Sequence, residues 1–291
     1  MNGKTAAVIG IGLIGGSIVK ALHVNKDDIK ILVSDKDESV LKMADNAGLV
    51  DGWSIDAREI VKDADIAVLC VPVCEMPALF DAIAPFMKKG AVITDAGSVK
   101  GFLQQHLKSD NTVYIGAHPM AGSEKSGFTA SDASLFAGRP YVIIKPEEAR
   151  DEKALDMVVS FIKAIRAYPV FMDAQSHDMA TAMVSHMPHV LSASLMIAAS
   201  EDSASSGARF LAAGCFRDMT RVSGADARMW TDICLTNGDA ILRQLSKVED
   251  LLAEARQKIV EKDEKWLMDF FAKGRSGRES FGMFITNGSG E

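Results

Sequence analysis

The stretch that decides the fold is Thr5-Ala6-Ala7-Val8-Ile9-Gly10-Ile11-Gly12-Leu13-Ile14-Gly15. Its first five residues predict a short buried strand, and helical spacing follows in the apolar residues Ile14, Ile18, Val19 and Leu22. Between a strand and a helix, G-x-G-x-x-G is typical of dinucleotide binding. The first glycine permits the tight turn, the second admits a pyrophosphate close to the backbone, and the third lets the helix pack on the strand. A bare glycine triplet also occurs in ordinary turns, so the flanking strand and helix are needed for this interpretation.

A second predicted strand, Ile29 to Ser34, ends at Asp35, twenty residues after Gly15. A carboxylate at that place accepts hydrogen bonds from the adenosine ribose hydroxyls and repels a 2′-phosphate. We therefore expect NAD rather than NADP, with its phosphates at the helix N-terminus. The residues expected to bind it are Gly10, Gly12, Leu13, Ile14, Gly15 and Asp35, together with Val71 and Pro72.

Length and composition indicate a two-domain globular enzyme. The chain has 291 residues, of which 48% are hydrophobic and 24% charged. The net charge of −7 has no basic excess for nucleic acid. We see no targeting segment and no apolar run that approaches a membrane span, so we expect a cytoplasmic protein without a membrane partner. The four cysteines lack paired zinc spacing and are expected to be buried thiols.

The pattern of the chain changes near residue 173. Before it, short β-rich runs alternate with helical patterns, which predicts a doubly wound, mostly parallel Rossmann-type sheet over residues 1–172. The expected later strands are Ile66 to Val71, Ala91 to Thr94, Val113 to Gly116, Tyr141 to Ile144 and Tyr168 to Met172. After it, the periodicity predicts an all-helical second domain over residues 173–291, with a loosely ordered tail from Lys273.

An apolar stripe runs along the last part of the helical domain. Its members are Val248, Leu251, Leu252, Ala255 and Ile259. The stripe can pack within the domain or on a second subunit, and we favour the domain core.

Residues that follow strands of a parallel sheet are candidates for the site, because ligands bind beyond the carboxyl ends of the strands. Val71 and Pro72 follow one predicted strand, Ser98 another, and His118 a third. A histidine there can act as a general base at neutral pH, and Ser98 can orient its imidazole. A hydrogen-bonded structural histidine is the alternative interpretation.

The helical domain supplies further polar residues. Ser185-His186-Met187-Pro188-His189 places two histidines three residues apart, and no Asp, Glu or Cys is positioned to complete a metal site, so we expect no metal. Pro188 should break or kink its helix. Between Lys163 and Lys247 every cationic residue is arginine. A planar guanidinium binds a carboxylate with two hydrogen bonds, which suits a small carboxylate substrate.

Four motifs together resemble the prephenate and arogenate dehydrogenase family, in order along nearly the whole chain. They are Gly97-Ser98-Val99-Lys100, then Gly116-Ala117-His118-Pro119-Met120-Ala121-Gly122-Ser123-Glu124, then Ser185-His186-Met187-Pro188-His189, then Phe216-Arg217-Asp218-Met219-Thr220-Arg221 with Trp230 nine residues later. This resemblance is far more specific than the glycine motif.

The resemblance implies roles for individual residues. His118 resembles the histidine that takes the proton of the ring hydroxyl while hydride leaves the same carbon for NAD, and Ser98 resembles its supporting serine. His189 resembles a histidine near the substrate, and Arg221 the arginine that binds a substrate carboxylate. The remaining matches concern the pocket: a closing loop at Ser123 and Glu124, and lining or supporting residues at Asp218 and Trp230.

The resemblance further implies oxidative decarboxylation of prephenate to 4-hydroxyphenylpyruvate in tyrosine biosynthesis, by a homodimer joined through the helical domain. An arogenate dehydrogenase that yields tyrosine directly is the alternative within the family. A β-hydroxyacid dehydrogenase would need a lysine in the second domain, and the lysine gap disfavours it. A non-catalytic NAD-binding sensor is the alternative of another class.

Overall fold

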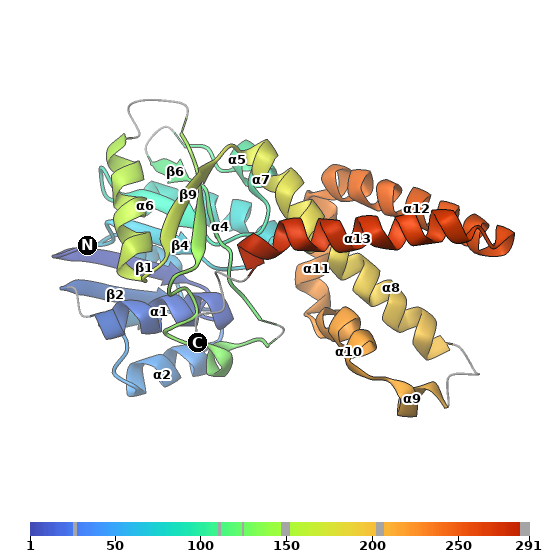
Figure 1. The fold of residues 1–291 in the computed structure, drawn as a ribbon. Helices are drawn as coiled ribbons and strands as arrows, with labels where there is room; N and C mark the ends of the chain where they lie inside the picture. The colour runs from blue at the N-terminus through green and yellow to red at the C-terminus, as the bar shows by residue number, and fades with distance from the viewer. Residues whose placement is uncertain (26–27, 110–111, 124, 147–151, 202–206, 286–291) are drawn as a thin grey trace. The chain divides into compact units, whose positions relative to one another are not determined.

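The computed structural model describes residues 1–25, 28–109, 112–123, 125–146, 152–201 and 207–285 (Figure 1). Its main sheet has six parallel strands in the order β3-β2-β1-β4-β5-β6. Their bounds are β1 (Lys4–Ile9), β2 (Ile29–Ser34), β3 (Gly52–Ser54), β4 (Ile66–Leu69), β5 (Val92–Asp95) and β6 (Val113–Ile115). The order reverses between β1 and β4, the place where doubly wound sheets bind ligands. The predicted Rossmann-type sheet is confirmed.

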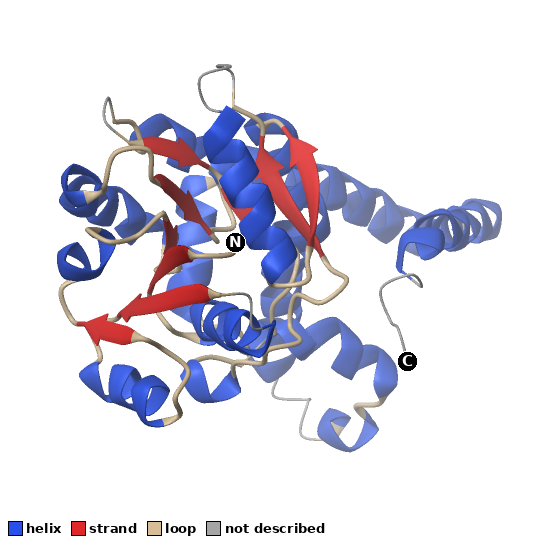
Figure 2. Cartoon of the chain, turned by 90° about the vertical axis from the view of Figure 1, so that its left-hand side faces the viewer, coloured by secondary structure: helices blue, strands red, loops and turns tan. Residues whose placement is uncertain are grey.

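Helices lie on both sides of this sheet (Figure 2). They are α1 (Leu13–Asn25), α2 (Glu38–Asn46), α3 (Ala57–Val61), α4 (Met76–Ile83), α5 (Lys100–His106) and α6 (Glu152–Ala164), with 3-10 turns η1 (Val73–Glu75), η2 (Ala84–Phe86) and η3 (Phe128–Ala130). Fully buried side chains from α1, from α6 and from β1 and β4 form one core, for example Ile18, Phe161 and Val68. Burial of this apolar surface is the main stabilising contribution.

A second, three-stranded sheet has the order β7-β8-β9. It consists of β7 (Ala117–Pro119), β8 (Pro140–Ile144) and β9 (Tyr168–Met172), with β7 antiparallel to β8 and β9 parallel to it. The sequence predicted β8 and β9 as members of the main sheet and did not predict β3 or β7. Strands of three residues are too short to show a period.

The helices after β9 begin with α7 (Ala174–Thr181), which continues through a π-helical turn (Ala182–His186) into α8 (Met187–Glu201). The wide turn lies just before Pro188, which cannot donate a backbone hydrogen bond, so the predicted kink takes the form of a π-bulge. The next elements are α9 (Ala208–Leu211), α10 (Gly214–Thr220), the 3-10 turn η7 (Arg221–Gly224) and α11 (Ala227–Thr236). By its internal contacts the chain forms two units, residues 1–238 and 239–291.

The second unit is a helical hairpin of α12 (Gly238–Glu261) and α13 (Glu264–Ile285). Between Lys262 and Asp263 the chain turns, with Lys262 in the left-handed region at a φ of 54°. The indole of Trp266 on α13 donates to the carboxylate of Glu254 on α12, at 3.0 Å. The loosely ordered tail predicted from Lys273 is wrong as far as Ile285, because Gly274, Gly277 and Gly282 are tolerated inside α13. A single helical glycine costs only about 1 kcal/mol.

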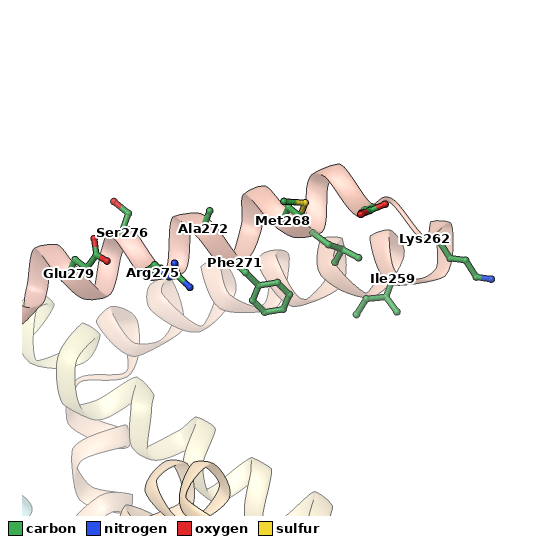
Figure 3. Close-up of a pocket in the computed structure, with 10 residues that line it drawn as sticks. Ile259, Lys262, Met268, Phe271, Ala272, Arg275, Ser276 and Glu279 are labelled. Atoms are coloured by element: carbon green, nitrogen blue, oxygen red, sulfur yellow. The ribbon is translucent and has the colours of Figure 1, made fainter.

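Side chains of both helices line an open groove of about 760 Å³ (Figure 3). Apolar groups dominate its lining, among them Ile259, Met268 and Phe271, which are 63%, 68% and 70% exposed. Leu251 and Leu252 are exposed as well. The interpretation of the apolar stripe as domain core is therefore wrong for these positions, because the hairpin leaves them uncovered.

Within the described residues, one continuous helical run, Ala174–Glu201, has the length and mean hydropathy (1.3) that would allow it to cross a membrane, and only 17% of its apolar window is buried. The expectation that no apolar run approaches a membrane span is therefore wrong by length and composition for this helix. Alanine, methionine and valine side chains raise its average. Length and composition alone are weak grounds for a membrane span, since core helices of other proteins share them.

Candidate active site

The glycine loop joins β1 to α1, and each glycine has a different reason to lack a side chain. Gly10 has a φ of +86°, and a Cβ there would lie 2.9 Å from the carbonyl oxygen of Cys70. A Cβ at Gly15 would lie 2.0 Å from the carbonyl oxygen of Gly10. At Gly12 a Cβ would meet no protein atom within 4 Å. No protein atom excludes a side chain at Gly12, so the backbone there is open to the approach of a pyrophosphate, as the G-x-G-x-x-G motif requires.

Leu13 and Ile14 lie in the first turn of α1, whose N–H groups have no intrahelical partner and point toward the loop. Asp35 follows β2 and accepts hydrogen bonds from Ile11 N at 2.8 Å and from Asp37 N at 3.0 Å. It therefore holds the glycine loop in place and keeps lone pairs for ribose hydroxyls. These residues fit a dinucleotide: an open cradle at Gly12, free N–H groups for phosphate, and a carboxylate beside them.

Val71 and Pro72 follow β4, as expected, and both are half-buried. A Cβ at Gly10 would come within 3.0 Å of Val71 Cγ1, so Val71 packs against the glycine loop. Ser98 lies between β5 and α5 and is half-buried. The structure thus places these three residues after neighbouring strands β4 and β5 of the main sheet.

His118 is the central residue of β7. Ala117 and Pro119 are buried, so the alternation of a strand turns the His118 side chain to the other face, where it is partly exposed. Its Nδ1 lies 2.9 Å from Nε2 of His177 on α7, and Nδ1 of His177 lies 2.8 Å from Oδ1 of Asp178. The Nδ1 partner of His118 is therefore His177 and not Ser98, whose role stays a prediction.

Asp178 is fixed by the beginning of α5. Its Oδ1 accepts a hydrogen bond from Lys100 N at 2.8 Å, and its Oδ2 accepts one from Gly101 N at 2.7 Å. A Cβ at Gly101 would lie 2.9 Å from that Oδ2, so glycine permits the close approach. Asn237 at the end of α11 donates to the Asp178 carbonyl oxygen at 2.9 Å. The beginning of α5 thus holds the Asp178 carboxylate, and Asn237 holds its backbone carbonyl.

A buried ion pair lies beneath His118. The ammonium of Lys100 bonds to the carboxylate of Asp95 and donates to the carbonyl oxygen of Ala117 at 2.6 Å. Asp95 also accepts from the Tyr114 hydroxyl at 2.6 Å and from Gly97 N at 2.7 Å. Both charged side chains are fully buried. Burial lowers the pKa of Lys100, and the neighbouring Asp95 opposes that shift.

The surroundings keep His118 neutral. Burial among protein groups lowers the pKa of His118 well below its ordinary value, and the nearby His177, Lys100 and His186 lower it further. A neutral imidazole can accept a proton, so the environment suits a general base at neutral pH.

Three predicted residues of the helical part lie together. The rings of His189 on α8 and Trp230 on α11 are stacked, with centroids 3.5 Å apart. Burial lowers the pKa of His189, and the charge of Arg221 lowers it further. His186 lies edge-on to Trp230, with centroids 6.0 Å apart. His186 also lowers the pKa of His118. The rings of His186, Trp230 and His189 therefore extend from the candidate base toward Arg221, the predicted carboxylate-binding residue.

Other predicted residues are more exposed. Arg221 opens η7 with its side chain exposed, and Asp218 is exposed on α10. Ser123 is exposed, and its hydroxyl accepts a hydrogen bond from Lys125 N at 3.1 Å. Glu124 lies outside the described residues. Among the residues described, no three His, Cys, Asp or Glu side chains are arranged to hold a metal ion.

Sequence reasoning missed His177, Asp178 and Asn237, and it quoted Lys100 without assigning it a role. One signal was available for the first two. A histidine and an aspartate are adjacent in a helix that also contains the predicted His189, and together they supply the acceptor and donor atoms that a buried base needs.

Comparisons with known proteins identify the family of the chain. Residues 18–170 match the family model of the prephenate dehydrogenase nucleotide-binding domain, and residues 173–273 match that of the prephenate dehydrogenase dimerization domain. The chain belongs to the prephenate dehydrogenase family.

Individual relatives cover almost the whole chain. A prephenate dehydrogenase of Lactococcus lactis subsp. cremoris is 36% identical over 95% of this chain and 77% of its own length. A cyclohexadienyl dehydrogenase of Zymomonas mobilis is 34% identical over 94% of this chain and 95% of its own. The prephenate dehydrogenase of A. aeolicus, solved with hydroxyphenyl propionate and NAD+, has the same fold, with a TM-score of 0.87, 24% identity and coverage of 97% of this chain and 99% of its own.

Proposed function

We propose that this enzyme oxidises and decarboxylates prephenate to 4-hydroxyphenylpyruvate, with His118 as the base and NAD as the hydride acceptor, in tyrosine biosynthesis. The observation that carries the proposal is the environment of His118 on β7. His177 holds its Nδ1 at 2.9 Å, and its surroundings lower its pKa well below the ordinary histidine value. Membership of the family and the dinucleotide cradle at Gly12 support it.

The chain's own groups supply the proton chemistry. Nε2 of His118 accepts the proton of the ring hydroxyl while hydride leaves the same carbon, which becomes a ketone conjugated with the ring. Bound NAD supplies the hydride acceptor. Loss of the ring carboxylate as CO₂ leaves its electron pair in the ring, and the resulting phenolate oxygen takes the proton back from His118. Aromatisation drives the decarboxylation, and the reaction releases no net proton.

Binding and orientation come from the helical residues. We assign a substrate carboxylate to the Arg221 guanidinium, which forms two parallel hydrogen bonds with such a group. His189, stacked on Trp230, offers Nε2 to the same substrate, because its Nδ1 is engaged by the Ser185 carbonyl oxygen at 2.8 Å. Ser98 lies beside the nicotinamide, and Ser123, Glu124 and Asp218 border the pocket in this proposal.

The cofactor proposal rests on Asp35. Its carboxylate beside the glycine loop would repel a 2′-phosphate, so NAD is preferred to NADP. Arogenate, which has an amino group where prephenate has a keto group, is the second candidate substrate, because a cyclohexadienyl dehydrogenase is among the relatives.

The test is NADH formation with each substrate and each cofactor, together with the His118→Asn variant. Wild-type enzyme should form NADH and 4-hydroxyphenylpyruvate from prephenate and prefer NAD. His118→Asn should lower kcat by about 10²- to 10⁴-fold, because it removes the general base. NAD affinity, measured by titration, should stay at the wild-type value. Near-normal turnover in the variant would remove His118 from the mechanism.

We also propose a cytoplasmic homodimer, with the substrate domain beginning at residue 173. The second family model is a dimerization domain, and the apolar groove of the α12–α13 hairpin is the kind of surface that a second copy covers. The exposed apolar face of Ala174–Glu201 is explained in the same way. Light scattering should give twice the chain mass, and Phe271→Glu should shift it toward the monomer.

A further inference from the structure

Three side chains form a hydrogen-bonded line behind the candidate base. Nδ1 of His118 meets Nε2 of His177 at 2.9 Å, and Nδ1 of His177 meets the Asp178 carboxylate at 2.8 Å. His177 is 1% exposed and Asp178 8%. The Asp178 carboxylate accepts from two backbone N–H groups of α5 as well. Because two backbone N–H groups already donate to it, the Asp178 carboxylate accepts from His177 as well.

This arrangement determines where the protons lie. Because Asp178 accepts from His177, the proton of neutral His177 is on Nδ1 and its Nε2 is bare. A bare Nε2 accepts, so His118 donates from Nδ1 and its own Nε2 is left without a proton. The tautomer of His118 that can act as a base is therefore fixed by a residue on another element, as a carboxylate does in a catalytic triad.

We propose that His177 and Asp178 are positioning and proton-holding residues: they fix the His118 tautomer and hold the substrate proton between hydride transfer and aromatisation. The inference rests on the proposed function. The hydroxyl proton moves to Nε2 of His118 as the Nδ1 proton moves to Nε2 of His177, which becomes an imidazolium beside the Asp178 carboxylate. When the phenolate forms, both protons move back. Nothing is consumed, and the only oxidant is the nicotinamide.

The neighbouring His186 provides a contrast within the same site. Its Nδ1 is 3.1 Å from the Asn237 amide, a neutral group. Burial lowers the pKa of His186 to about 4, and the charges of His177 and His189 contribute while Asp178 opposes. The ammonium of Lys100 also lies near His118 and lowers its pKa. A proton that leaves His118 therefore goes to the histidine that has a carboxylate partner.

The first test reads the tautomers directly. The chain has six histidines, whose ring nitrogens can be observed by NMR after labelling and assigned by single His→Gln variants. At neutral pH, His118 and His177 should both carry the proton on Nδ1. A proton on Nε2 of His118 would overturn the proposal. This readout needs no turnover, so it stands apart from the proposed function, which fails if wild-type enzyme forms no NADH with prephenate.

The second test uses His177→Gln, which keeps an acceptor for His118 but cannot take up a proton. We expect kcat to fall on the order of 10- to 100-fold, less than for loss of the base, with KM values within roughly twofold. The solvent deuterium dependence of kcat should be curved in wild type, because two protons move together, and linear in the variant.

Thr181→Val is the matched control, because Thr181 is buried on the same helix and its hydroxyl donates to the backbone carbonyl oxygens of His177 and Asp178. It should keep the curved dependence. Wild-type kcat in His177→Gln, or a linear dependence in wild type, would contradict the proposal. If His177→Gln does not fold, the tautomers of the wild type decide.

Discussion

The glycine loop and the histidine cluster of His118, His177 and Asp178 are built in opposite ways. The loop is one continuous stretch, and it works through missing side chains and backbone N–H groups. The cluster joins β7 to a helix 59 residues further along the chain, and it works through side-chain hydrogen bonds to buried partners. Changes in the loop should therefore act through sterics or ligand binding, whereas changes around the cluster should disturb buried charge.

The largest effect on stability is expected from Lys100→Met beneath the cluster. The change leaves the fully buried Asp95 carboxylate without its cation, although Tyr114 and Gly97 still donate to it. Breaking a buried pair by removal of one partner costs about 3 to 5 kcal/mol. Chemical denaturation should show this loss in the free energy of unfolding.

Lys88→Met is the matched control for a surface charge. Lys88 is 40% exposed and lies 3.0 Å from Asp65. Its loss should cost below about 1 kcal/mol. Equal losses for the two variants would mean that the Lys100 pair is not buried in solution.

A smaller effect on stability is expected for substitutions of Arg221. They test substrate binding separately from the glycine loop and from the histidine cluster. Because Arg221 is exposed on η7, its loss should cost below about 1 kcal/mol of stability, less than the loss of Lys100. Arg221→Ala and Arg221→Lys should both raise the KM for prephenate by an amount equivalent to about 1.5 to 3 kcal/mol, since lysine keeps the charge but lacks the planar fork. Steady-state kinetics with an NAD titration checks this. An unchanged KM would move the carboxylate contact to Arg217.

Two positions of the glycine loop should respond differently to the addition of one methyl group. Gly15→Ala places a Cβ 2.0 Å from the Gly10 carbonyl oxygen and should destabilise the protein by roughly 1 to 3 kcal/mol. Gly12→Ala meets no protein atom within 4 Å and should leave the melting temperature unchanged while it weakens NAD binding. A destabilised Gly12→Ala would show that the protein, and not a ligand, requires that glycine.

The loop could be predicted from sequence because its rules are local. A strand, three glycines and a helix are neighbours in the chain, and Asp35 lies where the next strand ends. The long strands β2 and β9 were predicted with their observed bounds for the same reason. The sequence predicted a loosely ordered tail where α13 continues, because glycines are as common in irregular segments as they are rare in helices.

The cluster could not be predicted in the same way. His118 was identified by its place after a strand and by family resemblance, but β7 is three residues long and has no period to read. The partners of His118 depend on how α7 packs against α5, a tertiary contact without a local signature. A buried lysine such as Lys100 contradicts the usual exposure of its residue type, so composition gives no hint of its role.

The pH dependence of kcat/KM for prephenate tests most directly whether His118 is a neutral base. Burial, together with His177, Lys100 and His186, lowers its pKa well below 6.5. Protonation removes the base, so activity is present above the lowered pKa and is lost as the pH falls through it. We predict a rate that is constant through neutral pH and falls only on the acid side of the ordinary histidine range. An acid limb at or above pH 6.5 would contradict the assignment of His118.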